Sequence, residues 1–193
     1  MYRQPAKVLE PDDVRRLLAH VRRHRYPQRD RVLILLSFKA GLRACEMAGL
    51  RWSMVLGSDG EVADHLSLAR SITKNATARR IPVHKLLGRA LARLHAQAGR
   101  PRDGPVIRSE RGAHMTARSI VNWFAGLYFE LELAGCSSHS GRRTFVTQAA
   151  RLVAKTGGSL RDVQELAGHK AITTTERYIE GNRTSQRRLI GLL

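Results

Sequence analysis

The sequence predicts an α+β fold that is mainly helical and contains a small antiparallel β-sheet. Apolar residues recur at the spacing of an amphipathic helix through most of the chain, whereas alternation with a period of two is confined to a stretch near 66–83. With 193 residues and a hydrophobic fraction of 42%, the chain can bury one substantial core. We therefore expect one folded domain.

The first part of the chain should form two helices. Residues 11–24 carry Pro11 at the first helical position, acidic residues in the first turn and an apolar stripe at helical spacing. The run 31–38 is apolar almost all round, which predicts a central buried helix that ends at Gly41.

A short segment over 46–50 and an apparent strand near 52–56 follow, and they lead into a turn. Beyond the turn, side chains alternate over 66–74, and a second extended run occupies 80–83. This pattern predicts a β-hairpin with Lys74 near its tip.

The rest of the chain reads as helical. Ser159 and Asp162 form a capping pair for one helix, and Gly168 suits the end of that helix. The helices predicted here cover 84–98, 117–134, 140–155, 160–167 and 174–180, with a short helix in the C-terminal tail.

The charge of the chain favours a polyanionic partner. Thirty-four Lys and Arg against 16 Asp and Glu leave a net charge of +18, and nucleic acid is the commonest partner of so basic a protein. Charge alone also fits a ribosomal or membrane-surface protein. The sequence contains neither an apolar stretch long enough for a transmembrane helix nor a secretory signal. Cys45 and Cys136 suit a cytoplasmic protein with two buried thiols.

Two pairs of residues have the spacing of an anion site. Arg43 follows the Gly-marked end of the buried helix, and Glu46 three residues later can hold its guanidinium. His139 and Arg142 open another helix on one face, beside free backbone N–H groups. Read separately, the first pair also fits an ordinary ion pair at a helix end, and the second also fits a solvated basic turn. The neighbouring Arg143 leaves the register of the second pair open.

Two further residues stand near the C-terminus. His169 follows Gly168 in a loop, and Tyr178 is expected on a short helix whose start Thr173 and Glu176 would cap. By itself such a His is more often a satisfied loop residue, and such a Tyr usually belongs to a core or an interface. Their combination with the two pairs changes that interpretation.

In combination, these clusters resemble the catalytic domain of the tyrosine recombinase, or phage integrase, family. The segment 41–54 resembles the first conserved box of the family, with Arg43 and Glu46 at its key positions. The pair His139 and Arg142 resembles the second box. Residues 167–178, in which Tyr178 follows His169 by nine positions, resemble the last. Three departures occur, all modest: Gly141 and Ala167 replace the usual Leu, and Arg143 replaces a common His or Lys.

The resemblance implies a role for each of these residues. Tyr178 would be the nucleophile that attacks a DNA phosphate, forming a 3′-phosphotyrosyl link and a free 5′-hydroxyl. Arg43 and Arg142 would bind the nonbridging oxygens, and Glu46 would orient Arg43. His139 would accept the proton of Tyr178, and His169 would hydrogen-bond the phosphate. Lys74 would be the general acid that protonates the departing 5′ oxygen.

No cofactor is expected, because the covalent link conserves the energy of the phosphodiester, and the sequence shows no metal-ligand cluster. The implied partner is double-stranded DNA, bound by a homo-oligomer that is a tetramer on DNA. An accessory DNA-bending protein is a further partner that the resemblance allows.

Two alternatives stay open. A type IB topoisomerase uses similar chemistry, and a catalytically idle DNA-binding or regulatory module could share the fold. Such an idle module would be expected to lack the Arg or Tyr, and both residue types are present here.

The expected domain organisation has three parts. Residues 1–8 form an N-terminal extension, 9–181 the catalytic domain and 182–193 a C-terminal tail helix. The tail would dock on a neighbouring subunit or pack on its own core. Family members usually carry a helical core-binding domain before the catalytic one. We expect none in this chain, whether it is a native single-domain protein or a fragment, because only the extension 1–8 precedes the expected catalytic domain.

Overall fold

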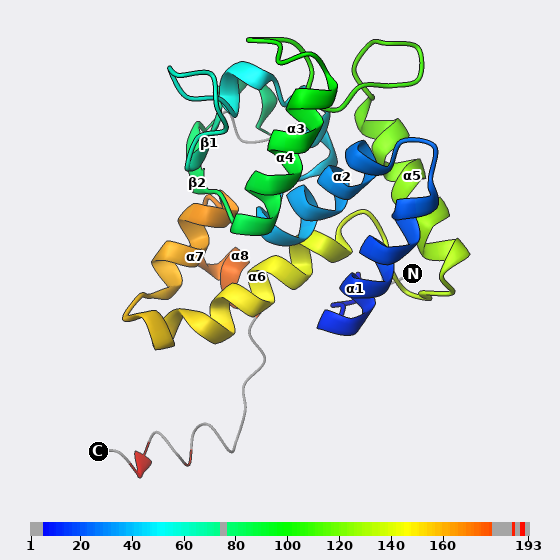
Figure 1. The fold of residues 1–193 in the computed structure, drawn as a ribbon. Coiled ribbons are helices and arrows are strands. Elements are labelled where there is room, and N and C mark those ends of the chain that lie inside the picture. Colours follow the sequence, from blue (N-terminus) through cyan, green and yellow to red (C-terminus); the bar gives the residue numbers. More distant parts are fainter. Residues whose placement is uncertain (1–5, 74–76, 179–186, 188–189, 192–193) are drawn as a thin grey trace.

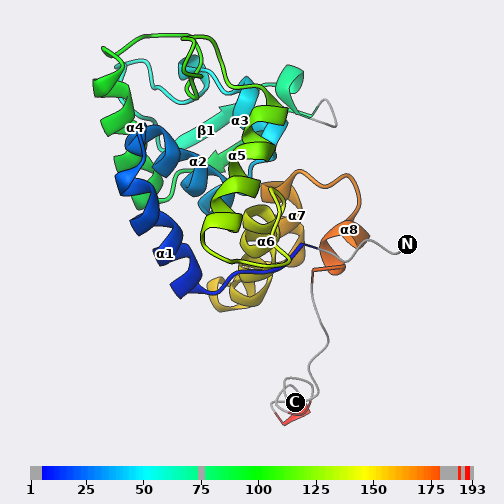
Figure 2. The same cartoon turned by 90° about the vertical axis from the view of Figure 1, so that its right-hand side faces the viewer.

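The fold was obtained as a computed structural model, which describes residues 6–73, 77–178, 187 and 190–191 (Figure 1). Helices dominate it, with one two-stranded sheet in the described part, as the sequence predicts. In both views α6, α7 and α8 gather below the sheet and α3 (Figure 2). The α-helices are α1 Pro11–His20, α2 Pro27–Lys39, α3 Ala44–Gly49, α4 Lys85–Gln97, α5 Ala117–Glu130, α6 Ser140–Leu152, α7 Leu160–Ala167 and α8 Ile172–Glu176. Short 3₁₀ helices are η1 Val21–Arg23, η2 Trp52–Met54, η3 Arg70–Ile72 and η4 Val153–Thr156.

Helix α2 is the centre of the core. Residues 32–36 are completely buried, because this helix is apolar on all sides and packs against both α4 and α6. The predicted central helix is therefore confirmed, and it begins four residues earlier, where Pro27 occupies its first turn. Gly41 follows it with a φ of 63°, a conformation that favours glycine.

The sheet pairs β1 His65–Leu68 with β2 Arg79–Pro82 in antiparallel register, and Leu66 faces Ile81. The hairpin is as predicted, but its first strand is shorter, since 70–72 turn into η3. That turn seats Ile72 against α3, where a Cβ at Gly49 would lie 2.5 Å from its Cγ2. The tip, with Lys74, lies outside the described residues.

The prediction of a strand near 52–56 is wrong. Residues 52–54 form η2, and only isolated bridges flank it. Trp52 and Val55 are both buried, and a 3₁₀ turn brings residues three apart to the same side, as a strand does not.

The end of the chain departs from expectation at two points. Helix α7 has the predicted Ser159 and Asp162 capping box and ends at Gly168. Helix α8, however, begins at Ile172 with no side-chain cap, so the box that Thr173 would open is wrong. Tyr178 therefore lies in the turn after α8. The predicted tail, 182–193, falls mostly outside the described residues.

The two cysteines are also placed differently from the prediction. Both thiols are free, but Cys45 is exposed and Cys136 only half-buried, so the expectation of two buried thiols is wrong. Among the described helices, none is both long and apolar enough to cross a membrane.

We expect Gly141→Ala to lower the free energy of unfolding by about 1–3 kcal/mol, because the added methyl group would overpack the α2–α6 contact. A Cβ at position 141 would lie 2.1 Å from Ser37 Oγ and 2.8 Å from Ser37 Cβ. Urea unfolding measures the change. Gly126→Ala in α5 is the matched control, since no atom lies within 4 Å of its added Cβ, and it should gain about 0.5–1 kcal/mol. Equal effects at both positions would contradict the packing argument.

Candidate active site

A cleft of about 700 Å³ brings together residues from distant parts of the chain. It lies where the start of α3, the start of α6 and the turn after α8 meet. Five of the six side chains predicted as catalytic line it, namely Arg43, His139, Arg142, His169 and Tyr178. The sixth, Lys74, lies outside the described residues.

Arg142 is the most buried cation of the cleft, with 4% of its surface exposed. Its Nη1 donates to the carbonyl of Gly41 and its Nη2 to that of Ala167, both at 2.7 Å. Burial, with the charges of Arg43 and Arg79, lowers the pKa of Arg142 to about 10, so the guanidinium stays charged at neutral pH. Arg143 is half-buried and lies over the Tyr178 ring, 5.7 Å from its centroid. Of the two neighbouring arginines, Arg142 is thus the buried one and Arg143 the half-buried one.

Glu46 is completely buried and binds two arginines. The expected pair with Arg43 is present, with Nη1 3.0 Å from Oε1 and the backbone N–H 2.8 Å from Oε2. Arg79 adds a bidentate pair, at 2.8 and 2.9 Å. Burial by itself raises the pKa of Glu46, but the bonds from Arg79 and Arg43 outweigh it and lower the pKa. The carboxylate is therefore ionised and holds both guanidiniums.

Arg79 is the residue that sequence reasoning missed. It lies in β2, two residues before the buried Ile81, so the period of a strand places both on the inner face. That alternation was the available signal. Its partner Glu46 is 33 residues away in the chain, and only the fold brings them together.

His169 is held in place on several sides. Its Nδ1 is 3.0 Å from Oγ1 of the completely buried Thr175, and its ring stacks on Tyr178 with centroids 5.7 Å apart. Gln164 accepts from its backbone N–H and donates to its carbonyl. Burial, with the charges of Arg142, Arg43 and Arg79, lowers the pKa of His169 to about 4. The ring is therefore neutral at neutral pH.

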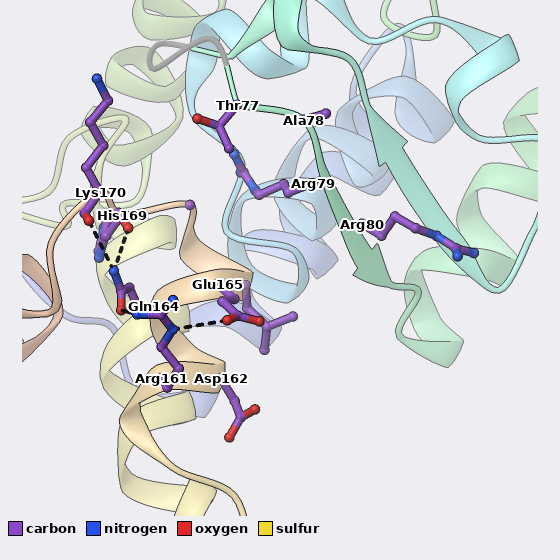
Figure 3. Close-up of a pocket in the computed structure, with 12 residues that line it drawn as sticks. Thr77, Ala78, Arg79, Arg80, Arg161, Asp162, Gln164, Glu165, His169 and Lys170 are labelled. Carbon is purple, nitrogen blue, oxygen red and sulfur yellow. Dashed lines mark hydrogen bonds and ion pairs between the residues drawn. The ribbon is translucent and has the colours of Figure 1, made fainter.

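A second cavity, of about 750 Å³, adjoins the cleft and shares His169 with it. Figure 3 shows the start of β2, with Arg79 and Arg80, across from α7 and the loop that carries His169 and Lys170. Arg161 of α7 pairs with Glu165 across 3.1 Å on its wall. The wall carries charges of both signs, with the cations in excess.

The described residues that line the cleft include no cluster suited to a metal ion. The one group of metal-ligating side chains in the described part of the chain, His20, His24 and Glu130, does not line it.

A model of the phage integrase family matches residues 7–184. The chain belongs to the phage integrase family. Among curated proteins, it is 31% identical to tyrosine recombinase XerC of Xylella fastidiosa strain 9a5c over 150 residues, which is 78% of this chain and 48% of that protein. It is 28% identical to XerC of Yersinia pestis over 174 residues, which is 89% of this chain and 54% of that protein. The chain thus spans about half the length of the curated relatives it matches.

Solved structures show the same fold. The Tn1549 transposon integrase in complex with a circular intermediate DNA matches with a TM-score of 0.75 and 20% identity, over 98% of this chain and 67% of that one. XerA recombinase matches with a TM-score of 0.75 and 18% identity, over 98% of this chain and 65% of that one. The mainly helical fold with its small sheet is thereby confirmed as that of integrase-family proteins.

The departures from the phage integrase pattern have structural explanations in two cases. Gly141 lies so close to Ser37 of α2 that no side chain fits, which accounts for the missing Leu. Ala167 is completely buried and its carbonyl accepts from Arg142, so a small residue there keeps α7 close to α6.

The lowered pKa of His169 predicts a pH dependence of stability. The unfolded His titrates near its ordinary value of about 6.5, so between about pH 6.5 and 4 the unfolded state binds about one more proton, and stability falls as the pH falls through that window. His169→Gln should flatten the loss of unfolding free energy between pH 7 and 4, as measured by urea unfolding. His114→Gln, at an exposed loop position, should leave the slope as in the wild type. Equal slopes in all three proteins would contradict the prediction.

Proposed function

We propose that this chain is the catalytic part of a site-specific DNA recombinase, which cleaves and rejoins DNA strands through a 3′-phosphotyrosyl intermediate. The observation that carries the proposal is the cleft in which three arginines, two histidines and Tyr178 converge. The tyrosine recombinases among its relatives and the DNA complex of the Tn1549 integrase support it.

In the proposed reaction the Tyr178 hydroxyl oxygen attacks the DNA phosphorus, and the bond from phosphorus to the 5′ oxygen breaks. The 5′ oxygen leaves with a proton from Lys74, and His139 accepts the proton of Tyr178. A 5′-hydroxyl then attacks the phosphotyrosine in the reverse sense, which restores Tyr178 and joins the strands. No energy-carrying cofactor is needed, because each step exchanges one phosphoester bond for another.

Charge builds on the nonbridging oxygens during the attack, and the arginines would stabilise it. Arg142 uses two of its roughly five N–H groups on backbone carbonyls, so further donors remain for a phosphate. Glu46 would keep Arg43 aimed at the same point. His169 would donate from Nε2 whenever the Thr175 hydroxyl donates to its Nδ1.

The proposed substrate is double-stranded DNA, and the proposed assembly on it is a tetramer, with room for an accessory DNA-bending protein. The net charge of +18 supports a polyanionic substrate. The lambda integrase dimer bound to a core site, similar with a TM-score of 0.69, supports the assembly of such proteins on DNA. A DNA substrate and two free thiols fit a cytoplasmic protein.

Tyr178→Phe should abolish covalent protein–DNA adducts and leave DNA affinity nearly unchanged, because one hydroxyl contributes little to a charge-dominated interface. Adducts of the wild-type chain are first recovered from genomic fragments and sequenced, and the trapped sequence is then built into a nicked suicide substrate. SDS gels measure the adduct, and filter binding measures the affinity. Tyr26→Phe, at a site remote from the cleft, is the matched control. Adducts that persist in Tyr178→Phe would exclude this nucleophile.

Arg43→Ala should slow cleavage of that substrate at least about a hundredfold, as expected for a lost transition-state stabiliser. Lys74→Ala should slow it about 10²–10⁴-fold as a lost general acid. A 5′-bridging phosphorothiolate has a better leaving group, so it should rescue Lys74→Ala and not Arg43→Ala. Rescue of the Arg43 variant alone would reverse the two assignments. Lys155→Ala, on the exposed η4, controls for the loss of a positive charge.

A further inference from the structure

Two histidines and a glutamate converge on the side of the molecule where α1 meets the end of α5. His20 is the last residue of α1, His24 follows η1, and Glu130 is the last residue of α5. The Nε2 atoms of His20 and His24 lie 2.8 and 3.8 Å from the same Glu130 Oε2. One ligand atom from each of the three residues lies within 4.8 Å of the other two.

A buried carboxylate fixes the orientation of His24. Asp30 has 2% of its surface exposed, and its Oδ2 lies 2.9 Å from His24 Nδ1. Its other oxygen accepts from Arg29 Nε at 2.8 Å. When His24 Nδ1 donates its proton to this carboxylate, Nε2 keeps a lone pair that a metal ion can bind. The carboxylate–histidine pair is the arrangement that orients histidine ligands around zinc.

The neighbouring cations do not compete for Glu130. Arg29 pairs with Asp30 and stacks on the Tyr26 ring at 4.5 Å, and Arg25 pairs with Glu110 at 3.5 Å. Among the described residues, Glu130 therefore pairs with His20 and His24 and with no arginine.

We propose that His20, His24 and Glu130 bind a zinc ion, with Asp30 as the outer partner of His24. Metal–ligand bonds of about 2.0–2.1 Å in tetrahedral geometry place the ligand atoms roughly 3.3 Å apart, close to the mean of the two observed separations. Two imidazoles and one carboxylate suit zinc and disfavour magnesium. Water would complete the coordination.

The bound ion would join segments that are 110 residues apart in the chain. Helix α5 also lines the cleft, through Val121 and Ala125, so the ion would fix the far end of a helix that forms one of its walls. The site is separate from the cleft, and the proposal does not depend on the proposed recombinase activity.

The test is titration of the tag-free full chain with zinc chloride, followed by calorimetry and thermal unfolding. We expect one equivalent to bind and the Tm to rise by about 5–10 °C at a free zinc concentration about a hundred times Kd. Cobalt(II) in place of zinc should give the intense visible absorption of four-coordinate cobalt, which zinc then removes. Magnesium chloride should produce neither change.

Variants locate the ion. Glu130→Gln preserves the shape of a half-exposed side chain but removes the carboxylate ligand. Loss of an outer partner costs roughly 10–100-fold in metal affinity, and the loss of this direct ligand should weaken zinc binding by more than that. His20→Ala should do the same. His114→Ala, which removes an exposed histidine elsewhere, should bind as the wild type does. No zinc binding by the wild type, or equal binding by Glu130→Gln, overturns the proposal, and circular dichroism verifies that each variant is folded.

Discussion

The geometry of the cleft depends on the buried guanidinium of Arg142. It donates to carbonyls of residues 101 and 25 positions away in the chain, at Gly41 and Ala167, and so ties the end of α2 and the end of α7 to α6. Hydrogen bonds to a charged group contribute about 1.5–3 kcal/mol each, which offsets much of the cost of burying the charge. Arg142, which would bind phosphate, therefore also holds these helices together.

Two glycines make this arrangement possible. Gly41 has a φ of 63°, and a Cβ there would lie 2.4 Å from the Phe145 ring. Gly168 has a φ of 64°, and a Cβ there would lie 2.8 Å from Arg79 Nη1. Each glycine therefore permits both a left-handed turn and a close approach that any side chain would prevent. The backbone at these turns brings α3 and His169 to the arginines.

Local patterns in the sequence predicted the parts of the fold and site that are themselves local. The buried α2, the pairing of Arg43 with Glu46 and the placement of His139 three residues before Arg142 follow from helix periodicity and short spacing. Arg79 escaped prediction because its partner is distant in the chain. Trp52 was misassigned to a strand because the run it starts is short and apolar, and only the three-residue spacing of the buried Trp52 and Val55 distinguishes the 3₁₀ turn from a strand.

The cleft is arranged for an anion because its charges do not balance. Arg43 and Arg79 bind the buried carboxylate of Glu46, and Arg142 lies close enough for the charges of both arginines to lower its pKa. Burial, together with these three positive charges, keeps His169 neutral. Mutual repulsion among these cations raises the energy of the folded chain, and an anion bound in the cleft relieves it. A phosphate would therefore gain both its own hydrogen bonds and the removal of that repulsion. The buried carboxylate of Glu46 reduces this repulsion because it bonds both Arg43 and Arg79, while the carbonyls of Gly41 and Ala167 hold Arg142.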